Sequence, residues 1–253
     1  MNNRLAVVTG GGSGLGRALC HALADRGLEV LAVGRRQAPL TETCRAYPER
    51  IRSLSADVAT ESGRDAIAAA VGGQAVAALV HNAGVLEPVA PLERISLQDW
   101  RHSQAINVEA PLFLTQLLLP WLRDGRVLHI SSGAAHSAYS GWGAYCTGKA
   151  ALYMLYQVWS KELVERGVAV GSVRPGVVDT PMQTLLRQQR RADFPAIDKF
   201  LDLHSRGKLE DPKAVAGFIS WLLLDVGTSA FARTEWTFTD PEQQAMWRRG
   251  DAL

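Results

Sequence analysis

The sequence predicts one α/β domain over residues 1–253, with a doubly wound parallel sheet and helices on both of its faces. Short apolar segments that end at glycines or polar turns alternate with segments of helical periodicity, which is the pattern of βαβ units. The 253 residues contain neither an internal repeat nor a linker-like tract. A chain of this length buries roughly three quarters of its unfolded surface, so we expect it to fold without disulfides.

The expected strands are apolar runs, and the expected helices carry apolar residues three or four positions apart. We expect strands at residues 5–8, 29–33, 50–55, 75–81, 126–130, 168–173 and 235–238. We expect helices at residues 14–26, 106–122, 145–164 and 212–224. Residues 180–206 are polar with scattered apolar positions. We expect this segment to form a mobile helical lid over the substrate rather than core.

Composition excludes several classes of protein. The formal net charge is +2 and no basic block is present, so we expect no nucleic-acid partner. The 3 cysteines show no C-x-x-C spacing, which predicts free thiols, a reducing compartment and no metal site. The apolar run after Met-Asn-Asn-Arg is too short for a signal peptide. No stretch reaches the roughly 18 apolar residues of a membrane span, so we expect a cytoplasmic protein.

A glycine-rich loop joins the first expected strand to the first expected helix. It reads Thr-Gly-Gly-Gly-Ser-Gly-Leu-Gly over residues 9–16, with the spacing G-x-x-x-G-x-G. Glycines let the backbone approach a pyrophosphate, and the helix N-terminus offers it free N–H groups. The alternative is an ordinary glycine-rich turn. We expect a Rossmann-type dinucleotide site that includes Gly10, Gly12, Ser13, Gly14, Leu15 and Gly16.

The residues after the next strands indicate which dinucleotide binds. Arg35 and Arg36 follow the second strand, where NAD-binding proteins carry a carboxylate for the ribose. Guanidinium groups match a 2′-phosphate, which favours NADPH over the alternative of a solvated arginine pair. Asp57 and Val58 follow the third strand and are expected at the adenine, although Asp57 is equally suited to cap a helix. The small residues after the fourth strand are expected to pass close to the cofactor, namely Asn82, Ala83 and Gly84.

Tyr145 and Lys149 are four residues apart in an expected helix, so they share a face. A cation about 4 Å from a phenol is worth on the order of 4 kcal/mol, which predicts a tyrosine pKa roughly two to three units below its usual value of about 10. Tyr145 would then serve as a general acid for a carbonyl group. Ser132 ends a strand, and its hydroxyl would position the same carbonyl. Taken alone, the Tyr-x-x-x-Lys pair would be better explained as two residues on a helix surface.

Taken together, these motifs resemble the short-chain dehydrogenase/reductase family over essentially the whole chain. The set comprises the glycine loop, Asn82-Ala-Gly84, Asn107, Ser132, Tyr145-x-x-x-Lys149 and Arg174-Pro-Gly176. The resemblance implies that Lys149 contacts the nicotinamide ribose and that Asn107 holds a water linked to Lys149. It also implies further cofactor contacts from Pro175, Gly176, Val178 and Thr180.

Several segments resemble the sepiapterin reductase and benzil reductase branch of that family, including residues 141–150, 154–157, 179–183 and 207–209. That branch is NADPH-dependent, and its arginine for NADP falls at Arg35. Two positions depart from sepiapterin reductases: Ser13 replaces an arginine, and Thr237 replaces the aspartate that anchors the pterin. We therefore expect a less polar ketone or diketone as substrate.

The expected substrate contacts are Ser132, Trp142, Tyr145, Gly176 and Met182. An apolar cleft would also use Tyr139, Leu185 and Phe194. The resemblance implies a homodimer, or a tetramer, through the two helices near Asn107 and Tyr145. Alternatives for function are a sepiapterin-type pterin reductase, an alcohol dehydrogenase that uses NAD, and an NADPH-binding sensor without catalysis.

Overall fold

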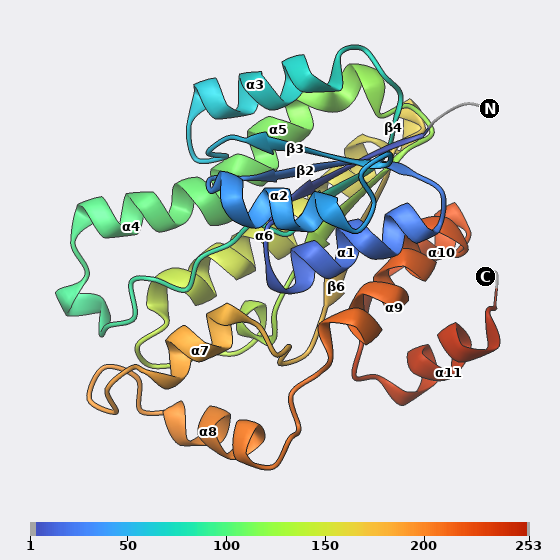
Figure 1. Cartoon of the computed structure of the whole chain (residues 1–253). Coiled ribbons are helices and arrows are strands. Elements are labelled where there is room, and N and C mark those ends of the chain that lie inside the picture. Colours follow the sequence, from blue (N-terminus) through green and yellow to red (C-terminus); the bar gives the residue numbers. More distant parts are fainter. Residues whose placement is uncertain (1–3, 252–253) are drawn as a thin grey trace.

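The computed structural model describes residues 4–251 and contains one seven-stranded sheet (Figure 1). All neighbouring strands pair in parallel, in the order β3-β2-β1-β4-β5-β6-β7. The strands are β1 Leu5–Thr9, β2 Glu29–Gly34, β3 Ile51–Ser55, β4 Val76–His81, β5 Arg126–Ile130, β6 Ala169–Arg174 and β7 Glu235–Thr237. The strand order reverses between β1 and β4, which places a ligand crevice at their carboxyl ends. The predicted doubly wound fold is confirmed.

The helices follow the predicted alternation along the chain. They are α1 Gly14–Asp25, α2 Gln37–Arg45, α3 Glu61–Val71, α4 Leu97–Gln104, α5 Ala110–Leu118, α6 Gly143–Glu162, α7 Pro181–Arg187, α8 Ile197–Ser205, α9 Pro212–Leu224, α10 Thr228–Arg233 and α11 Pro241–Arg249. Within residues 4–251, no helix combines the length and the apolar character that crossing a membrane requires.

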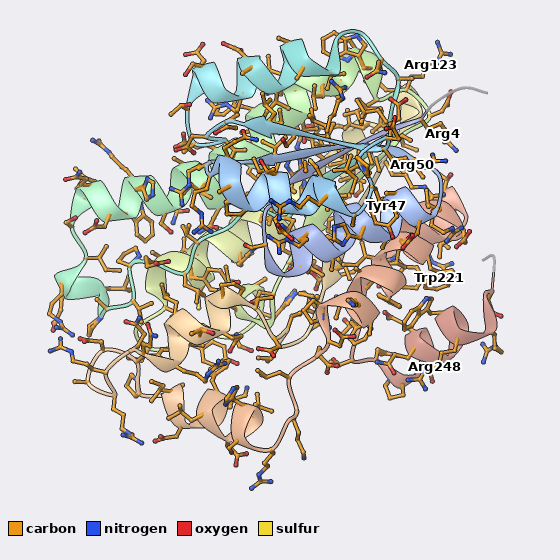
Figure 2. The ribbon with its side chains drawn as sticks, in the orientation of Figure 1. Arg4, Tyr47, Arg50, Arg123, Trp221 and Arg248 are labelled. Carbon is orange, nitrogen blue, oxygen red and sulfur yellow. The ribbon has the colours of Figure 1, made fainter. Side chains whose placement is uncertain are left out.

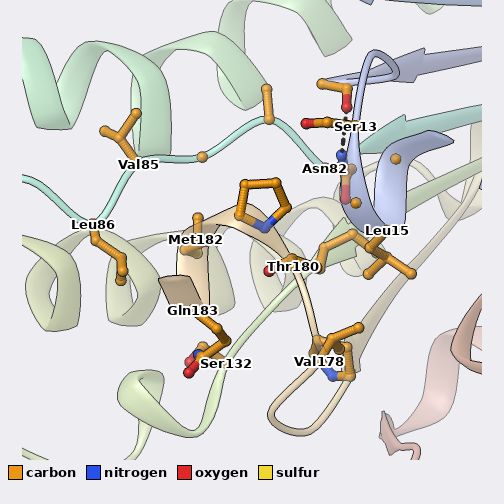
Figure 3. A pocket seen from close by; sticks show the side chains of 18 of the residues that line it. Ser13, Leu15, Asn82, Val85, Leu86, Ser132, Val178, Thr180, Met182 and Gln183 are labelled. Carbon is orange, nitrogen blue, oxygen red and sulfur yellow. Dashed lines mark hydrogen bonds between the residues drawn. The ribbon is translucent and has the colours of Figure 1, made fainter. Parts of the chain in front are cut away.

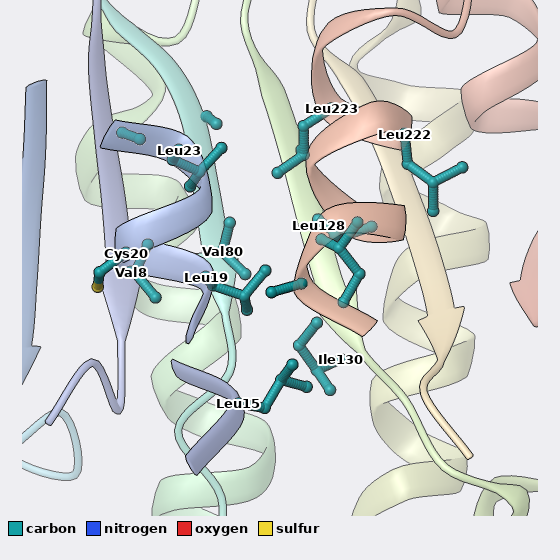
Figure 4. Close-up of a cluster of buried hydrophobic side chains, with 14 of the residues drawn as sticks. Val8, Leu15, Leu19, Cys20, Leu23, Val80, Leu128, Ile130, Leu222 and Leu223 are labelled. Carbon is teal, nitrogen blue, oxygen red and sulfur yellow. The ribbon is translucent and has the colours of Figure 1, made fainter. Parts of the chain in front are cut away.

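One face of the sheet is covered by α1 and α9. Figure 4 shows Leu15, Leu19 and Leu23 of α1 beside Leu222 and Leu223 of α9, over strand residues such as Val8, Val80 and Leu128. The leucines of α1 are spaced four residues apart, so they share one face of the helix. This packing fixes the N-terminus of α1, and with it the glycine loop, relative to β1.

The opposite face of the sheet is covered by α3, α5 and α6. Leu114 and Leu118 of α5 are fully buried there, and Tyr156 and Trp159 of α6 pack in the same cluster. Side chains such as Arg50, Arg123 and Arg248 lie at the periphery of the molecule (Figure 2). Strands β1, β2, β4, β5 and β6 are therefore largely buried on both faces, which explains why they read as apolar runs.

Two expectations about the helical segments were wrong. The helical run before β5 begins at Leu97, and a π turn over Ala105–Glu109 interrupts it where one continuous helix was expected at 106–122. The lid also has a core of its own, because Leu186 and Phe194 are fully buried and Phe200 is 4% exposed. This cluster could not be predicted from the sequence, because polar residues separate its members along the chain. It forms only when α7 and α8 pack on Trp142.

Candidate active site

A cavity of about 630 Å³ opens at the carboxyl ends of the strands (Figure 3). It runs from the glycine loop, past the ends of β4 and β5, to the lid helices α7 and α8. Every residue expected from the sequence to contact cofactor or substrate or to take part in catalysis lines it, apart from Asn107 and Phe194. Five basic and two acidic side chains are among the described residues of its wall: Arg35, Arg36, Lys149, Arg174 and Lys199, and Asp57 and Glu87.

The glycine loop leaves no room for side chains at its tightest points. Gly10 and Gly14 have φ of 69° and 51°, a region that L-residues other than glycine seldom adopt. A Cβ atom on Gly16 would lie 2.1 Å from the carbonyl oxygen of Gly10. Ser13 precedes α1 without capping it through its side chain. The N–H groups of the first helical turn therefore face the loop without a side-chain partner.

Asn82 and Thr9 hold the loop against the end of β4. The Asn82 amide Nδ2 donates to the Thr9 carbonyl over 2.8 Å. In return, the Thr9 hydroxyl accepts the backbone N–H groups of Asn82, at 3.1 Å, and Ala83, at 3.0 Å. These bonds connect the first and fourth strands, on either side of the point where the strand order reverses.

Arg35 and Arg36 line the cavity just after β2. Neither forms an ion pair with a carboxylate of residues 4–251. Asp57 also lines this end, and its Oδ1 accepts the N–H of Ala59 over 3.0 Å. The alternative that Asp57 caps a helix was wrong, since Thr60 caps α3 by accepting from Gly63.

These features fit a bound dinucleotide. The glycine loop is a cradle that a single Cβ atom would fill, and the helix N-terminus beside it attracts an anion. Two guanidinium groups without a carboxylate partner among residues 4–251 lie at the same end, where a second phosphate would be neutralised. The end of β4 allows a similarly close approach, because a Cβ atom on Gly84 would lie 3.2 Å from Asn107 Oδ1.

Tyr145 lies in the first turn of α6, with Ser132 beside it on the loop after β5. Tyr145 is 7% exposed. Burial raises the pKa of Tyr145 to about 12, and the Ser132 hydroxyl partly opposes this rise. The predicted lowering of the tyrosine pKa by Lys149 was therefore wrong for the polypeptide by itself. Burial disfavours the phenolate more than the neighbouring groups stabilise it.

Lys149 follows one turn later in α6 and is almost fully buried. Its Nζ donates to the Ile130 carbonyl over 2.7 Å and lies 5.7 Å from the centre of the Tyr145 ring. Burial lowers the pKa of Lys149 to about 8. The ammonium group thus lies near the Tyr145 ring, and both residues line the same cavity.

Asn107 lies behind the cavity wall, in the π turn between α4 and α5. Its Oδ1 accepts the Val85 N–H over 3.1 Å, and its Nδ2 donates to the Val85 carbonyl over 3.0 Å and to Ser103 Oγ over 3.2 Å. The side chain therefore fixes the chain after β4. A π turn inserts one extra residue into a helix and is frequent at functional sites. The water-holding role stays a prediction.

The substrate end of the cavity is aromatic. Tyr139, Trp142, Met182 and Leu185 line it, as expected. The expectation for Phe194 was wrong, because its ring is fully buried behind Trp142, stacked at 4.6 Å and 20°. Several other residues of this wall were not predicted from the sequence, including Leu86, Gln183, Lys199 and Phe200. The helical spacing of Ile197, Phe200 and Leu201 was the available signal for the last two.

Thr237, at the end of β7, lines the cavity beside Arg174. The Arg174 guanidinium donates to Thr237 Oγ1 over 3.1 Å from Nε and 2.8 Å from Nη2. Arg174 also lies 3.3 Å from the Glu235 carboxylate. This part of the wall therefore presents a hydroxyl held by a cation, in place of a free carboxylate.

Comparison with known proteins agrees with this geometry. Residues 4–191 match the family model for short chain dehydrogenases. The chain is 34% identical over 233 residues to a benzil reductase ((S)-benzoin forming) of Bacillus cereus, covering 87% of this chain and 94% of the relative. It is 34% identical over 228 residues to a sepiapterin reductase of Xenopus tropicalis, covering 82% and 86%.

The fold gives the same result. The crystal structure of a short chain dehydrogenase/reductase from Saccharomyces cerevisiae superposes with a TM-score of 0.88 at 29% identity, covering 96% of this chain and 98% of the other. The glycine loop and the Ser132, Tyr145 and Lys149 set of this chain therefore lie on a parallel-sheet architecture that the solved structure shares. The chain belongs to the short-chain dehydrogenase/reductase family, and it is similar to the benzil reductase and sepiapterin reductase branch.

Proposed function

We propose that this oxidoreductase reduces a ketone or a 1,2-diketone to the hydroxy compound with NADPH. One observation carries the proposal: a single cavity has Arg35 and Arg36 at one end and Ser132, Tyr145 and Lys149 at the other. The first pair suits a 2′-phosphate, and the second set suits a carbonyl group. NADPH, when bound, supplies the hydride.

Each residue of the set has a distinct task in the proposed reaction. The Ser132 hydroxyl donates a hydrogen bond to the substrate carbonyl and holds it near Tyr145. The Tyr145 phenol gives its proton to the carbonyl oxygen as negative charge develops there. Because burial raises its pKa to about 12, Tyr145 carries that proton throughout the neutral range. Lys149 fixes the floor of the site through Ile130 and places a cation near the phenolate that remains.

The proposed cofactor preference rests on Arg35 and Arg36, which lack carboxylate partners among the described residues. An alcohol dehydrogenase that uses NAD would instead carry a carboxylate at this position to bind the ribose hydroxyls. A comparison of NADH and NADPH at equal concentrations tests the choice. A strong preference for NADH would overturn it.

The proposed substrate class rests on the wall of the cavity. Tyr139, Trp142, Met182 and Leu185 favour an aromatic or aliphatic carbonyl compound. A pterin needs a carboxylate for its guanidine-like edge, whereas Thr237 offers a hydroxyl already bonded to Arg174. The hydrogen-bonded Thr237 and Arg174 pair therefore supports a diketone rather than sepiapterin as the substrate.

The experiment is an NADPH-oxidation assay with benzil, sepiapterin and simple ketones. Tyr145→Phe should lower kcat about 10²- to 10⁴-fold, the usual range for a lost general acid, while NADPH binding survives. Tyr47→Phe is the matched control, because it removes a phenol that lies outside the cavity wall. Retention of most activity by Tyr145→Phe would remove Tyr145 from the mechanism.

We also propose that the protein is a homodimer. Apolar side chains protrude from neighbouring helices on one side of the molecule, namely Phe113 and Leu117 of α5 and Met154 and Val158 of α6, which are 37–55% exposed. An unpartnered apolar face of this kind favours self-association. Sedimentation of the wild type and of Met154→Glu tests the proposal, and a monomeric wild type would contradict it.

A cytoplasmic location is proposed as well. Cys20, Cys44 and Cys146 are free thiols, and Cys20 is buried in the core. Free thiols persist in a reducing compartment. Fractionation of cells that express the tagged protein tests the location.

A further inference from the structure

Lys199 stands apart from the other basic side chains of the cavity. It lies in α8 of the lid, is exposed, and lines the substrate end. Its Nζ donates to the Tyr139 hydroxyl over 3.3 Å. The same ammonium group lies 5.6 Å from the centre of the Tyr139 ring and 5.8 Å from that of Phe200. Two aromatic rings thus hold a cation where the cavity meets solvent.

The other cationic side chains of the wall differ from Lys199 in their contacts or in their position. Lys149 donates to the Ile130 carbonyl, and Arg174 is held by Thr237 and Glu235. Arg35 and Arg36 lie at the nucleotide end. Within residues 4–251, Lys199 forms no ion pair, although the carboxylate of Glu87 also lines the cavity.

The aromatic wall separates Lys199 from the proton donor. The ring of Tyr139, which Lys199 contacts, lies 5.2 Å from that of Trp142, and Trp142 lies 5.5 Å from that of Tyr145. Within residues 4–251, the rings of Tyr139 and Tyr145 form no aromatic pair with each other. A ligand whose carbonyl oxygen reaches Tyr145 would therefore extend along Trp142 to bring a second group to the Lys199 ammonium.

We propose that Lys199, with the Tyr139 hydroxyl, binds a carboxylate of the substrate at the end remote from the reacting carbonyl. The preferred substrate is then an aromatic or aliphatic ketone or diketone with a distal acidic group. An ammonium and a hydroxyl together donate to both oxygens of a carboxylate, and Trp142 and Phe200 cover the apolar part in between. The inference rests on the proposed function for the position of the carbonyl.

The test uses benzil with a para-carboxylate and benzil with a para-carboxamide, which have similar shape and differ in charge. Dissociation constants are measured by calorimetry with the intact protein saturated with NADP⁺, so that no turnover occurs. We expect the wild type to bind the carboxylate about five- to tenfold more tightly than the carboxamide, the range for a charge-assisted bond that is partly exposed.

Three variants make the assignment specific. Lys199→Met should bring the ratio of the two dissociation constants to about one, whereas Lys199→Arg should retain most of the preference. Lys208→Met is the matched control, because Lys208 is exposed and lies outside the cavity wall. It should keep the wild-type ratio.

An equal affinity of the wild type for both ligands, or a preference that persists in Lys199→Met, would overturn the inference. Its failure is separable from failure of the proposed function. Turnover of unsubstituted benzil with NADPH tests the reductase activity, while the ratio of dissociation constants tests Lys199 whether or not turnover occurs.

Discussion

The two ends of the cavity are built in different ways. The nucleotide end is built around the backbone of the glycine loop, with Gly10, Gly14 and Gly16 packed so closely that a Cβ atom on Gly16 would lie 2.1 Å from a carbonyl oxygen. The substrate end consists of large side chains, with Trp142 and Phe200 in the wall and Phe194 behind them. Backbone that is this close cannot move aside, whereas side chains can repack. The first end should therefore tolerate far less change than the second.

The two ends of the cavity also differ in which segments of the chain supply their residues. The glycine loop is one contiguous segment between β1 and α1. The substrate end draws on Leu86 after β4, on Tyr139 and Trp142 before α6, and on the lid helices α7 and α8. Its shape thus depends on how distant segments pack, which leaves room for changes in specificity with the same chemistry.

The largest effect expected from this contrast comes from Gly16→Ala. The new methyl group meets the Gly10 carbonyl at 2.1 Å, so the loop must shift. We expect a loss of more than about 3 kcal/mol in the free energy of unfolding, at the upper end of overpacking effects, and at least hundredfold weaker NADPH binding by the folded fraction. Urea unfolding and fluorescence titration with NADPH measure the two.

Gly34→Ala is the control for Gly16→Ala. Gly34 lies at the end of β2 in the same cavity, and the nearest atom to its added Cβ would be Leu40 Cδ2, at an ordinary 3.5 Å. The variant should fold and bind NADPH nearly as the wild type does. Equal losses in both variants would show that the nucleotide end responds to any added methyl group rather than to the clash.

The next effect concerns the strands that both ends share. His81 of β4 and His129 of β5 contact each other in the core, with ring centres 5.3 Å apart. Burial lowers the pKa of His129 to about 4, and that of His81 well below its usual value. Unfolded histidine takes up a proton below about pH 6.5, so the unfolded state binds more protons between there and pH 4. As the pH is lowered from about 6.5 to 4, His129 alone should therefore reduce the free energy of unfolding by about 3 kcal/mol.

Urea unfolding at neutral pH and near pH 4 measures this loss. In His129→Leu the loss between the two pH values should be smaller by about 3 kcal/mol, whatever the variant does to packing at neutral pH. An unchanged pH dependence would mean that His129 is protonated in the folded state. Measuring NADPH affinity and ketone affinity in the wild type and in His129→Leu would show whether the shared strands support both ends of the cavity equally.

The double variant Arg35→Ala, Arg36→Ala sharpens the comparison at the nucleotide end. Both side chains line the cavity outside the glycine loop, so the double variant leaves the sequence of that loop unchanged. Since a hydrogen bond to a charged group is worth about 1.5–3 kcal/mol, NADPH binding should weaken about ten- to a hundredfold while NADH binding stays within about twofold. Equal weakening for both cofactors would assign the arginines a role in loop structure instead.

The nucleotide end of the cavity could be predicted from the sequence better than the substrate end. The strand, glycine-loop and helix pattern predicted β1, α1 and the cavity end beside them, because neighbouring residues in sequence make that structure. Lys199 and Phe200 were missed, because they reach the cavity only when α8 packs against Trp142. The effect of burial on Tyr145 was also missed, since the depth of a phenol in the folded protein depends on the lid as much as on α6.

The smallest effect is expected at the buried side of the substrate end. Phe194 does not line the cavity and pairs with the rings of Trp142 and Phe200, so Phe194→Leu removes two aromatic pairs and leaves the wall itself in place. We expect a loss of about 1 kcal/mol in stability and a few-fold rise in KM for the ketone, with NADPH binding unchanged. A parallel loss in NADPH affinity would mean that the lid core and the glycine loop are coupled, and the two ends would then have to be treated as one packed unit.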